Sequence, residues 1–418
     1  MVASKWKEHM LLYLMQRKLK QMKEKANFRE SHSQPFQSKM TKARNRIRDR
    51  SRGLAIMNEM SHWEFERMFR MSRYGFNRLL HKVSIHLFFN PQKATNSSGS
   101  AISIVVRLAA TLRWLAGGSH LDIAAMFGLD LHNFFNSNYV LWTTMDAICT
   151  ALKLGFSLDP EYLKKTADDF YRYTKDCMYG CVSAIDGWVM ETRCPTKKEA
   201  FQRITDYRNR KGFWGILVLA GCDSHCRFNM FSPMWPGATH DHLAWEMSKL
   251  KKIIEDNASL PEPYYVIGDD AFVNTDKFLI PYAGRGLEDW KDSYNYHLSL
   301  MRQCIERAFG ILTQRWGVFW RPIRCAKNKW SKIAMCAAKL HNYCIDEKLK
   351  CPEFRHVEHQ QVGDRWLIRN NDILEGEDDG GRRALRPLGA LNRRLSFVTE
   401  LKDIGKRRPA HAMCNSRS

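Results

Sequence analysis

Hydrophobic residues recur at helical spacing through the first part of the chain, from Trp63 to about Phe156. Serines stand where helices would begin, as Ser72 and Ser119 do, and glycines stand where helices would end. A helix, a tight turn containing glycine and a second helix outline a helix-turn-helix module, although two packed helices without a DNA role fit this spacing equally well. The predicted helices span residues 76–87, 104–115, 119–127 and 131–152.

After Pro160 the apolar segments become shorter and more continuous, which is typical of buried strands. Helical patterns lie between and after them, so we predict an α/β domain. Three of the strands end in an aspartate. The predicted strands span residues 181–185, 213–222, 227–231 and 264–267, and the predicted helices 241–250, 296–314 and 329–347.

Charge is concentrated at the two ends of the chain. Of the net charge of +22, residues 1–52 carry +11 and residues 382–418 carry +8, which leaves +3 for everything between them. A nearly neutral body with two basic arms indicates a polyanionic partner, nucleic acid first of all. The arms could equally be solvating tails or nuclear-import signals, and we expect them to supply most of the non-specific DNA affinity.

Composition excludes several other classes of protein. An apolar content of 44% fits a folded protein, and no apolar run approaches the roughly 18 residues that a membrane span needs. The start of the chain is not a secretory signal, so its twelve cysteines are expected to be free thiols. The group Cys222, His225 and Cys226 allows a zinc site, but thiols are the better interpretation because no second pair has suitable spacing.

Aspartates at the ends of strands are candidates for an active site, because α/β folds place their sites at the carboxyl ends of strands. Asp186 and Asp269 occupy such positions. Asp223 does too, but it is expected in a hairpin turn and ranks below them. Asp241 begins a predicted helix, where capping is a rival role.

Glu306 lies on the predicted helix 296–314, at the edge of its apolar face and one turn after Arg302. From there its carboxylate could reach over the end of the sheet. Carboxylate clusters of this kind suit Mg²⁺ or Mn²⁺, two of which can support phosphoryl displacement. Each acid alone is more simply a turn residue, a cap, a loop residue or an ion-pair partner, and only the set favours a metal site.

Six sequence blocks, taken together, resemble the PIF/Harbinger-type transposases, which include the Harbinger-derived nuclease proteins. They appear in the family's order and at familiar intervals, and with the helical region they cover over half of the chain. The blocks are Ala184-Ile185-Asp186-Gly187, Tyr207-Arg208-Asn209-Arg210-Lys211-Gly212, Cys222-Asp223, Trp235-Pro236-Gly237-Ala238-Thr239-His240-Asp241, Ile267-Gly268-Asp269-Asp270-Ala271-Phe272 and Arg302-Gln303-Cys304-Ile305-Glu306-Arg307-Ala308-Phe309-Gly310.

The resemblance implies an RNase H-like fold, a mixed sheet flanked by helices, behind an all-α helix-turn-helix-like domain. It implies a catalytic triad of Asp186, Asp269 and Glu306, with Asp241 as a further metal ligand. We divide the chain into a basic N-terminal arm (1–62), a helical domain (63–156), a catalytic domain (170–347), and an acidic linker with a basic C-terminal arm (348–418).

Basic residues near these blocks are candidates for DNA contact, by their charge and position. They are Arg208, Arg210, Lys211 and Arg302. Asp270 departs from the family, which has a small residue there. The stretch from Trp114 to Leu152 contains no Lys or Arg, which is unusual for a DNA-reading helix, although its asparagines at 133, 136 and 138 could pair with adenine.

The sequence therefore predicts a nuclear, metal-dependent DNA endonuclease or transposase that cleaves transposon ends and transfers strands. The alternative is a domesticated descendant that kept the fold as a DNA- or protein-binding module, and a ribonuclease H-type enzyme is a weaker third. Expected partners are double-stranded DNA, a second copy of the chain and, from the resemblance, a separate Myb-like DNA-binding protein. No membrane partner is expected.

Overall fold

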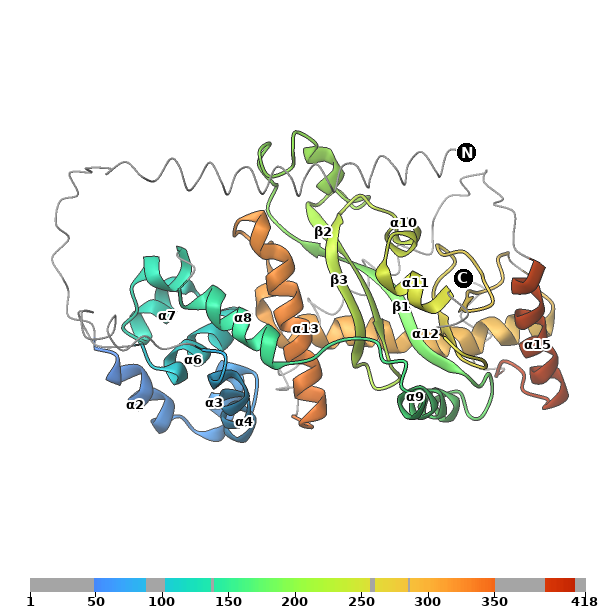
Figure 1. The fold of residues 1–418 in the computed structure, drawn as a ribbon, viewed down its shortest axis with the longest axis horizontal. Coiled ribbons are helices and arrows are strands. Elements are labelled where there is room, and N and C mark those ends of the chain that lie inside the picture. The colour runs from blue at the N-terminus through green and yellow to red at the C-terminus, as the bar shows by residue number, and fades with distance from the viewer. Residues whose placement is uncertain are drawn as a thin grey trace. The chain divides into compact units, whose positions relative to one another are not determined.

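The computed structural model describes residues 49–87, 102–136, 139–255, 260–284, 286–349 and 388–409. Most of the predicted N-terminal arm and of the acidic linker lies outside these residues. The first part is all-helical, as predicted (Figure 1). Its elements are α2 (Ser51–Glu59), α3 (His62–Phe69), α4 (Arg73–Ser84), α6 (Ile104–Leu115), α7 (His120–Met126), η1 (His132–Asn136) and α8 (Leu141–Ala151).

Serine caps fix the starts of these helices. The Ser72 hydroxyl accepts a hydrogen bond from the backbone N–H of Gly75, and Ser119 caps α7 in the same way, as predicted. α6 has the predicted bounds. The predicted N-terminal arm, residues 1–62, includes α2. This helix buries Met57 against the other helices and so packs with the helical region.

The predicted long helix over residues 131–152 is wrong. A π-helical turn, η1, occupies residues 132–136, and α8 begins only at Leu141. Residues 131–152 have the apolar content of one continuous helix. The start of α8 carries no capping signal in the sequence, since its N-cap residue Val140 makes no side-chain hydrogen bond to the helix. A helix-turn-helix module with a long second helix is therefore not present in the described residues.

The second part is a five-stranded mixed sheet in the order β3-β2-β1-β4-β5. β1 pairs antiparallel with β2 and parallel with β4, and β2 pairs antiparallel with β3. This confirms the mixed sheet flanked by helices. The strands are β1 (Cys181–Glu191), β2 (Gly215–Cys222), β3 (Phe228–Pro236), β4 (Tyr265–Ile267) and β5 (Phe278–Leu279).

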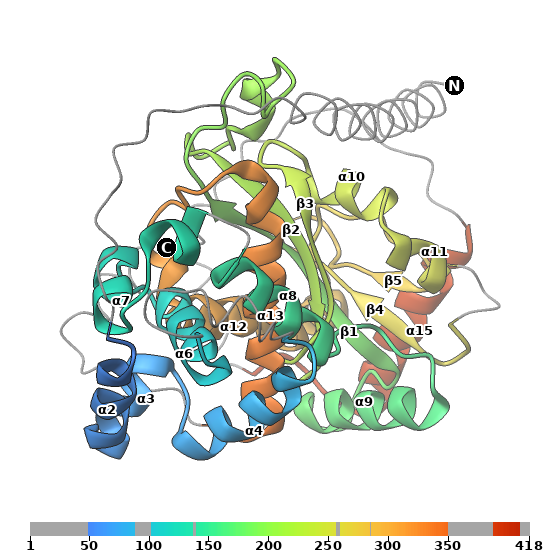
Figure 2. The same cartoon turned by 60° about the vertical axis from the view of Figure 1, so that its left-hand side comes forward.

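Helices cover both faces of the sheet, as the alternation along β2 requires. Ile216, Val218 and Ala220 point to a core shared with α12 (Asp289–Arg315) and α13 (Trp330–Asp346). Leu217 and Leu219 point to a core shared with α9 (Pro160–Tyr173), α10 (Asp241–Glu246) and α11 (Lys249–Glu255). Figure 2 shows α12 and α13 on one side of the strands, and α10 and α11 on the other.

The segment predicted as an acidic linker and a basic C-terminal arm, residues 348–418, contains a folded part at residues 388–409. They contain a helix, α15 (Leu388–Asp403), which packs against α12 and buries Phe397 and Leu401 completely or nearly so. The surrounding basic residues hid this helix in the sequence, because they make the segment resemble a basic tail.

Candidate metal centre

Asp186 lies inside a strand, not at its end. It is the sixth residue of β1, which continues to Glu191 and pairs with β2 along its length. On the other side of β1, however, the parallel partner β4 ends at Ile267, opposite Ala184. The chain therefore leaves β4 beside Asp186, and Asp269 arrives there two residues later. The prediction that Asp186 lies at the edge of the sheet where strands end is therefore correct only on the side of β4.

Asp241 reaches the same place from a third element. It is the first residue of α10, and His240 is the N-cap, so Asp241 does not have the capping role that rivalled metal binding. Its carboxylate lies against Gly187, where a Cβ atom would overlap it. The glycine after Asp186 thus makes room for the third acid, a function that the sequence did not reveal.

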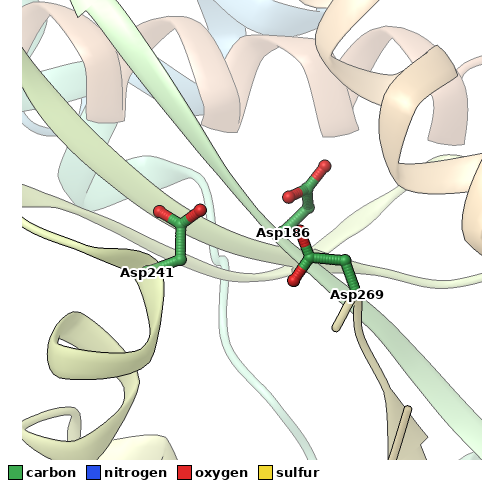
Figure 3. Close-up of side chains that lie close together, drawn as sticks. All are labelled: Asp186, Asp241 and Asp269. Carbon is green, nitrogen blue, oxygen red and sulfur yellow. The ribbon is translucent and has the colours of Figure 1, made fainter. Parts of the chain in front are cut away.

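The three aspartates form one cluster. Carboxylate oxygens of Asp186, Asp241 and Asp269 all lie within 4.8 Å of one another. Figure 3 shows the side chains converging from β1, from the start of α10 and from the segment after β4. It is the only group of three or more possible metal ligands among the described residues. All-oxygen donor sets of this kind fit hard divalent cations such as Mg²⁺ or Mn²⁺.

The pKa values of the three aspartates also indicate a site for a cation. Burial, together with the nearby charges of Asp269 and Asp241, raises the pKa of Asp186 to about 8. Burial and the charge of Asp269 raise the pKa of Asp241 to about 7. Burial also raises the pKa of Asp269, and Arg302 opposes this rise. A cation bound among these three carboxylates would relieve the repulsion between their negative charges.

Glu306 is not part of the cluster in this structure. It lies on α12 with its side chain 45% exposed, and one of its oxygens is 3.4 Å from the Arg302 guanidinium. The same Arg302 lowers the pKa of both Asp186 and Asp269, so it faces the cluster. Arg302 therefore acts by its charge on two of the aspartates and is also paired with Glu306.

The other basic candidates lie in the segment before β2. Arg208, Arg210 and Lys211 are exposed there, and the Arg208 side chain donates to the carbonyl of Gly212. The charge of Arg210 lowers the pKa of Asp241 and of Asp269, so this arginine is the one nearest to the cluster.

The remaining acidic and thiol candidates have structural roles. Asp223 lies in the turn between β2 and β3, where its carboxylate accepts the backbone N–H groups of His225 and Arg227, as its lower rank predicted. Asp270 is exposed and acts on Asp269 only by its charge. The imidazole of His225 contacts Asp169, and neither Cys222 nor Cys226 belongs to a metal-ligand group among the described residues, which leaves them as thiols.

Comparisons with known proteins agree with this site. Residues 185–342 match the family model described as DDE superfamily endonuclease, and this segment holds all three aspartates and Glu306. Protein ALP1-like of Arabidopsis thaliana is 24% identical over 327 residues, an alignment that covers 74% of this chain and 75% of that protein. No solved structure matches significantly. No helix among the described residues is long and apolar enough to cross a membrane.

Proposed function

We propose that this chain, whose residues 185–342 form a DDE superfamily endonuclease domain, is a metal-dependent DNA endonuclease of the Harbinger transposase type. The observation that carries the proposal is the convergence of Asp186, Asp241 and Asp269 from three separate elements. Packing alone does not explain three adjacent, partly buried carboxylates, because each one raises the energy of its neighbours. A site that binds cations does explain them.

In the proposed reaction Asp186, Asp241 and Asp269 would hold the divalent ions. Bound there, such ions activate an attacking water or 3′-hydroxyl and stabilise the leaving oxygen of the phosphodiester. Arg302 and Arg210, whose charges both act on the cluster, would neutralise charge on the phosphodiester and orient its phosphate. Glu306 would join the ligand set after its carboxylate leaves Arg302, and this residue remains a proposed ligand.

The direct test is nicking of supercoiled or end-containing duplex DNA by the purified chain with Mg²⁺ or Mn²⁺. Asp186→Asn and Asp269→Asn should each abolish nicking, because the amide keeps the shape of the carboxylate and loses its charge. Asp223→Asn is the matched control, since Asp223 lies on the same domain but outside the cluster. Full activity in either cluster variant would remove that residue from the site.

Strand transfer, nuclear localisation, assembly into at least a dimer and cooperation with a Myb-like DNA-binding protein belong to the same proposal. They rest on the resemblance to Harbinger-type transposases, since transposition requires two DNA ends in one complex. Basic residues at both ends of the chain support a nuclear, DNA-associated role.

A domesticated DNA-binding module without catalysis is the second candidate. The ion pair between Arg302 and Glu306 favours it, because the expected last ligand is engaged elsewhere. The two candidates differ in one result. Wild-type chain that binds duplex DNA but never nicks it with either metal, under any salt condition, would favour the binding module.

A further inference from the structure

Two basic segments far apart in the sequence lie side by side beyond the carboxyl end of β1. Residues 193–211 form the connection from β1 to β2, and residues 321–332 lead from α12 into α13. Thr192 forms a parallel bridge with Ile323, and the Arg193 side chain donates to the Arg324 carbonyl. Figures 1 and 2 both show the β1–β2 connection projecting past the strands, near the start of α13.

Together these two segments, here called the basic platform, have a net positive charge larger than that of the whole body, residues 53–381. They hold twelve Lys and Arg against two Asp and Glu, a net of +10. Residues 53–381 as a whole carry only +3, which leaves −7 for the rest of the body. Sequence reasoning missed this concentration because the two segments are separated by more than a hundred residues. Eight of the basic side chains are exposed: Lys197, Lys198, Arg203, Arg208, Arg210, Lys211, Arg321 and Arg324.

The two acidic residues of the platform serve its internal structure. Glu199 receives two hydrogen bonds from Arg193 and one each from the backbone N–H groups of Thr196 and Lys327, which hold its pKa at about 2. Glu199 thus joins the two segments while charged. Asp206 pairs with Arg203. Among the described residues, the structure records no acidic partner for Lys197, Lys198, Arg321 or Arg324.

The platform is continuous with the aspartate cluster. The backbone of Ala238, three residues before Asp241, donates to the carbonyl of Asp206 within the platform. Arg210, also in the platform, acts on Asp241 and Asp269 by its charge. Along β1 and the residue after it, the six steps from Asp186 to Thr192 span about 20 Å. This corresponds to about six base pairs of duplex at roughly 3.4 Å each.

We propose that the basic platform is the docking surface for the duplex that flanks the cleaved phosphodiester. This inference rests on the proposed nuclease function, because the cluster would act on a phosphodiester. The cations of the platform would then contact the phosphates of the duplex next to that phosphodiester. Duplex DNA fits better than a short acidic peptide, since the platform has a net charge of +10 and begins about 20 Å along β1 from the cluster that would act on a phosphodiester.

The test measures how the affinity of the full chain for a 24-base-pair duplex depends on salt, without divalent metal. Two double variants remove two platform charges each, K197A/K198A and R321A/R324A. The control K164A/K165A removes two exposed charges from α9, outside the platform. Each lost phosphate contact lowers the slope of log affinity against log salt by about 0.9, so each platform variant should lose up to about 1.8. The control should keep the wild-type slope.

Equal slopes for the platform variants, the control and the wild type would overturn the proposal, as would a change only with single-stranded DNA. The nuclease proposal fails separately. Asp186→Asn should keep the wild-type salt slope and lose nicking, whereas K197A/K198A and R321A/R324A should change the slope. Nicking that persists in Asp186→Asn would count against the metal centre and leave the platform result standing.

Discussion

At the scale of single residues, the site depends on a glycine as much as on its three aspartates. Alternation along β1 directs Asp186 toward α12 and Gly187 toward α10, where the carboxylate of Asp241 fills the space that a side chain would take. The sequence predicted Asp186, Asp269 and Glu306 as a triad with Asp241 as a further ligand, and the structure brings together the three aspartates without Glu306. Sequence reasoning undervalued Asp241, because a helix start suggests capping and only the fold shows that His240 takes the capping position.

Asp241→Asn is therefore expected to be as damaging as Asp186→Asn, not the mildest of the acid variants as its position in the sequence suggests. Losing one of three charges that hold the ions should reduce the nicking rate about 100-fold or more. The measurement is initial nicking rate with Mn²⁺ at saturating DNA. A variant with more than about half of the wild-type rate would place Asp241 outside the catalytic set.

Gly187→Ala should remove metal binding without removing the fold, because the new methyl group overlaps the Asp241 carboxylate and displaces it. Gly310→Ala is the matched control on α12. Nothing lies within 4 Å of its added Cβ, and alanine should stabilise the helix by up to about 1 kcal/mol. Calorimetric titration with Mn²⁺ compares the two, and equal affinities in both variants would contradict the role given to Gly187.

The metal-free protein should become less stable as the pH rises through about 7 to 8. The pKa values of Asp186 and Asp241 are raised by folding, so their neutral forms are favoured in the folded state. Their contribution to stability is complete below about pH 4, the ordinary pKa of aspartate, and is lost as the pH passes the folded values. At pH 8 with chelator, Asp186→Asn should raise Tm by a few degrees. A Tm equal to that of the wild type at pH 8 would argue against this.

At the scale of elements, the sequence predicts those whose signals are local. α6 follows a capping serine and ends before two glycines, and β2 is a continuous apolar run, so both were found with nearly correct bounds. β1 was cut short at Asp186 because a carboxylate and a glycine normally end a strand. β5 has only two residues and forms by pairing with β4, so no local sequence pattern predicts it.

α15 shows how tertiary packing overrides a compositional prediction. The Arg394 guanidinium lies 3.6 Å from the centre of the Tyr282 ring, and Arg408 pairs with Asp292 on α12. Arg394 on α15 and Arg408 after it thus attach the C-terminal segment to the rest of the fold. Deleting residues 382–418 would thus remove part of the fold as well as charge, and it is a poor test of DNA binding by the arm.

Leu401→Ala should destabilise the protein by about 2–5 kcal/mol, because this side chain of α15 is fully buried. Leu395→Ala, on the same helix but 42% exposed, should change stability by less than about 0.5 kcal/mol. Urea unfolding of both variants provides the comparison. If both changes cost the same, α15 is not docked on the domain as described.

At the scale of the whole molecule, the helical region packs against the α/β part of the chain. α8 contacts α13 more extensively than it contacts any other element, and it buries Trp142, Met145 and Ile148. On its outer side Asp146 pairs with Lys332 of the basic platform, 2.5 Å apart. The order of motifs in the sequence predicted the α/β part of the chain and its candidate ligands, whereas contacts between distant segments, such as this one, depend on the complete fold.

This packing leads to the last prediction, that the chain does not read its DNA ends well alone. A reading helix brings Arg or Lys to base edges and flanking phosphates, but residues 114–152 contain neither, and α8 is occupied by α13. The platform would bind the backbone of any sequence alike. We therefore expect selective binding only with a Myb-like partner. Competition binding at physiological salt, with inverted-repeat and scrambled duplexes, measures this. A hundredfold preference by the chain alone, about 2.7 kcal/mol, would refute it.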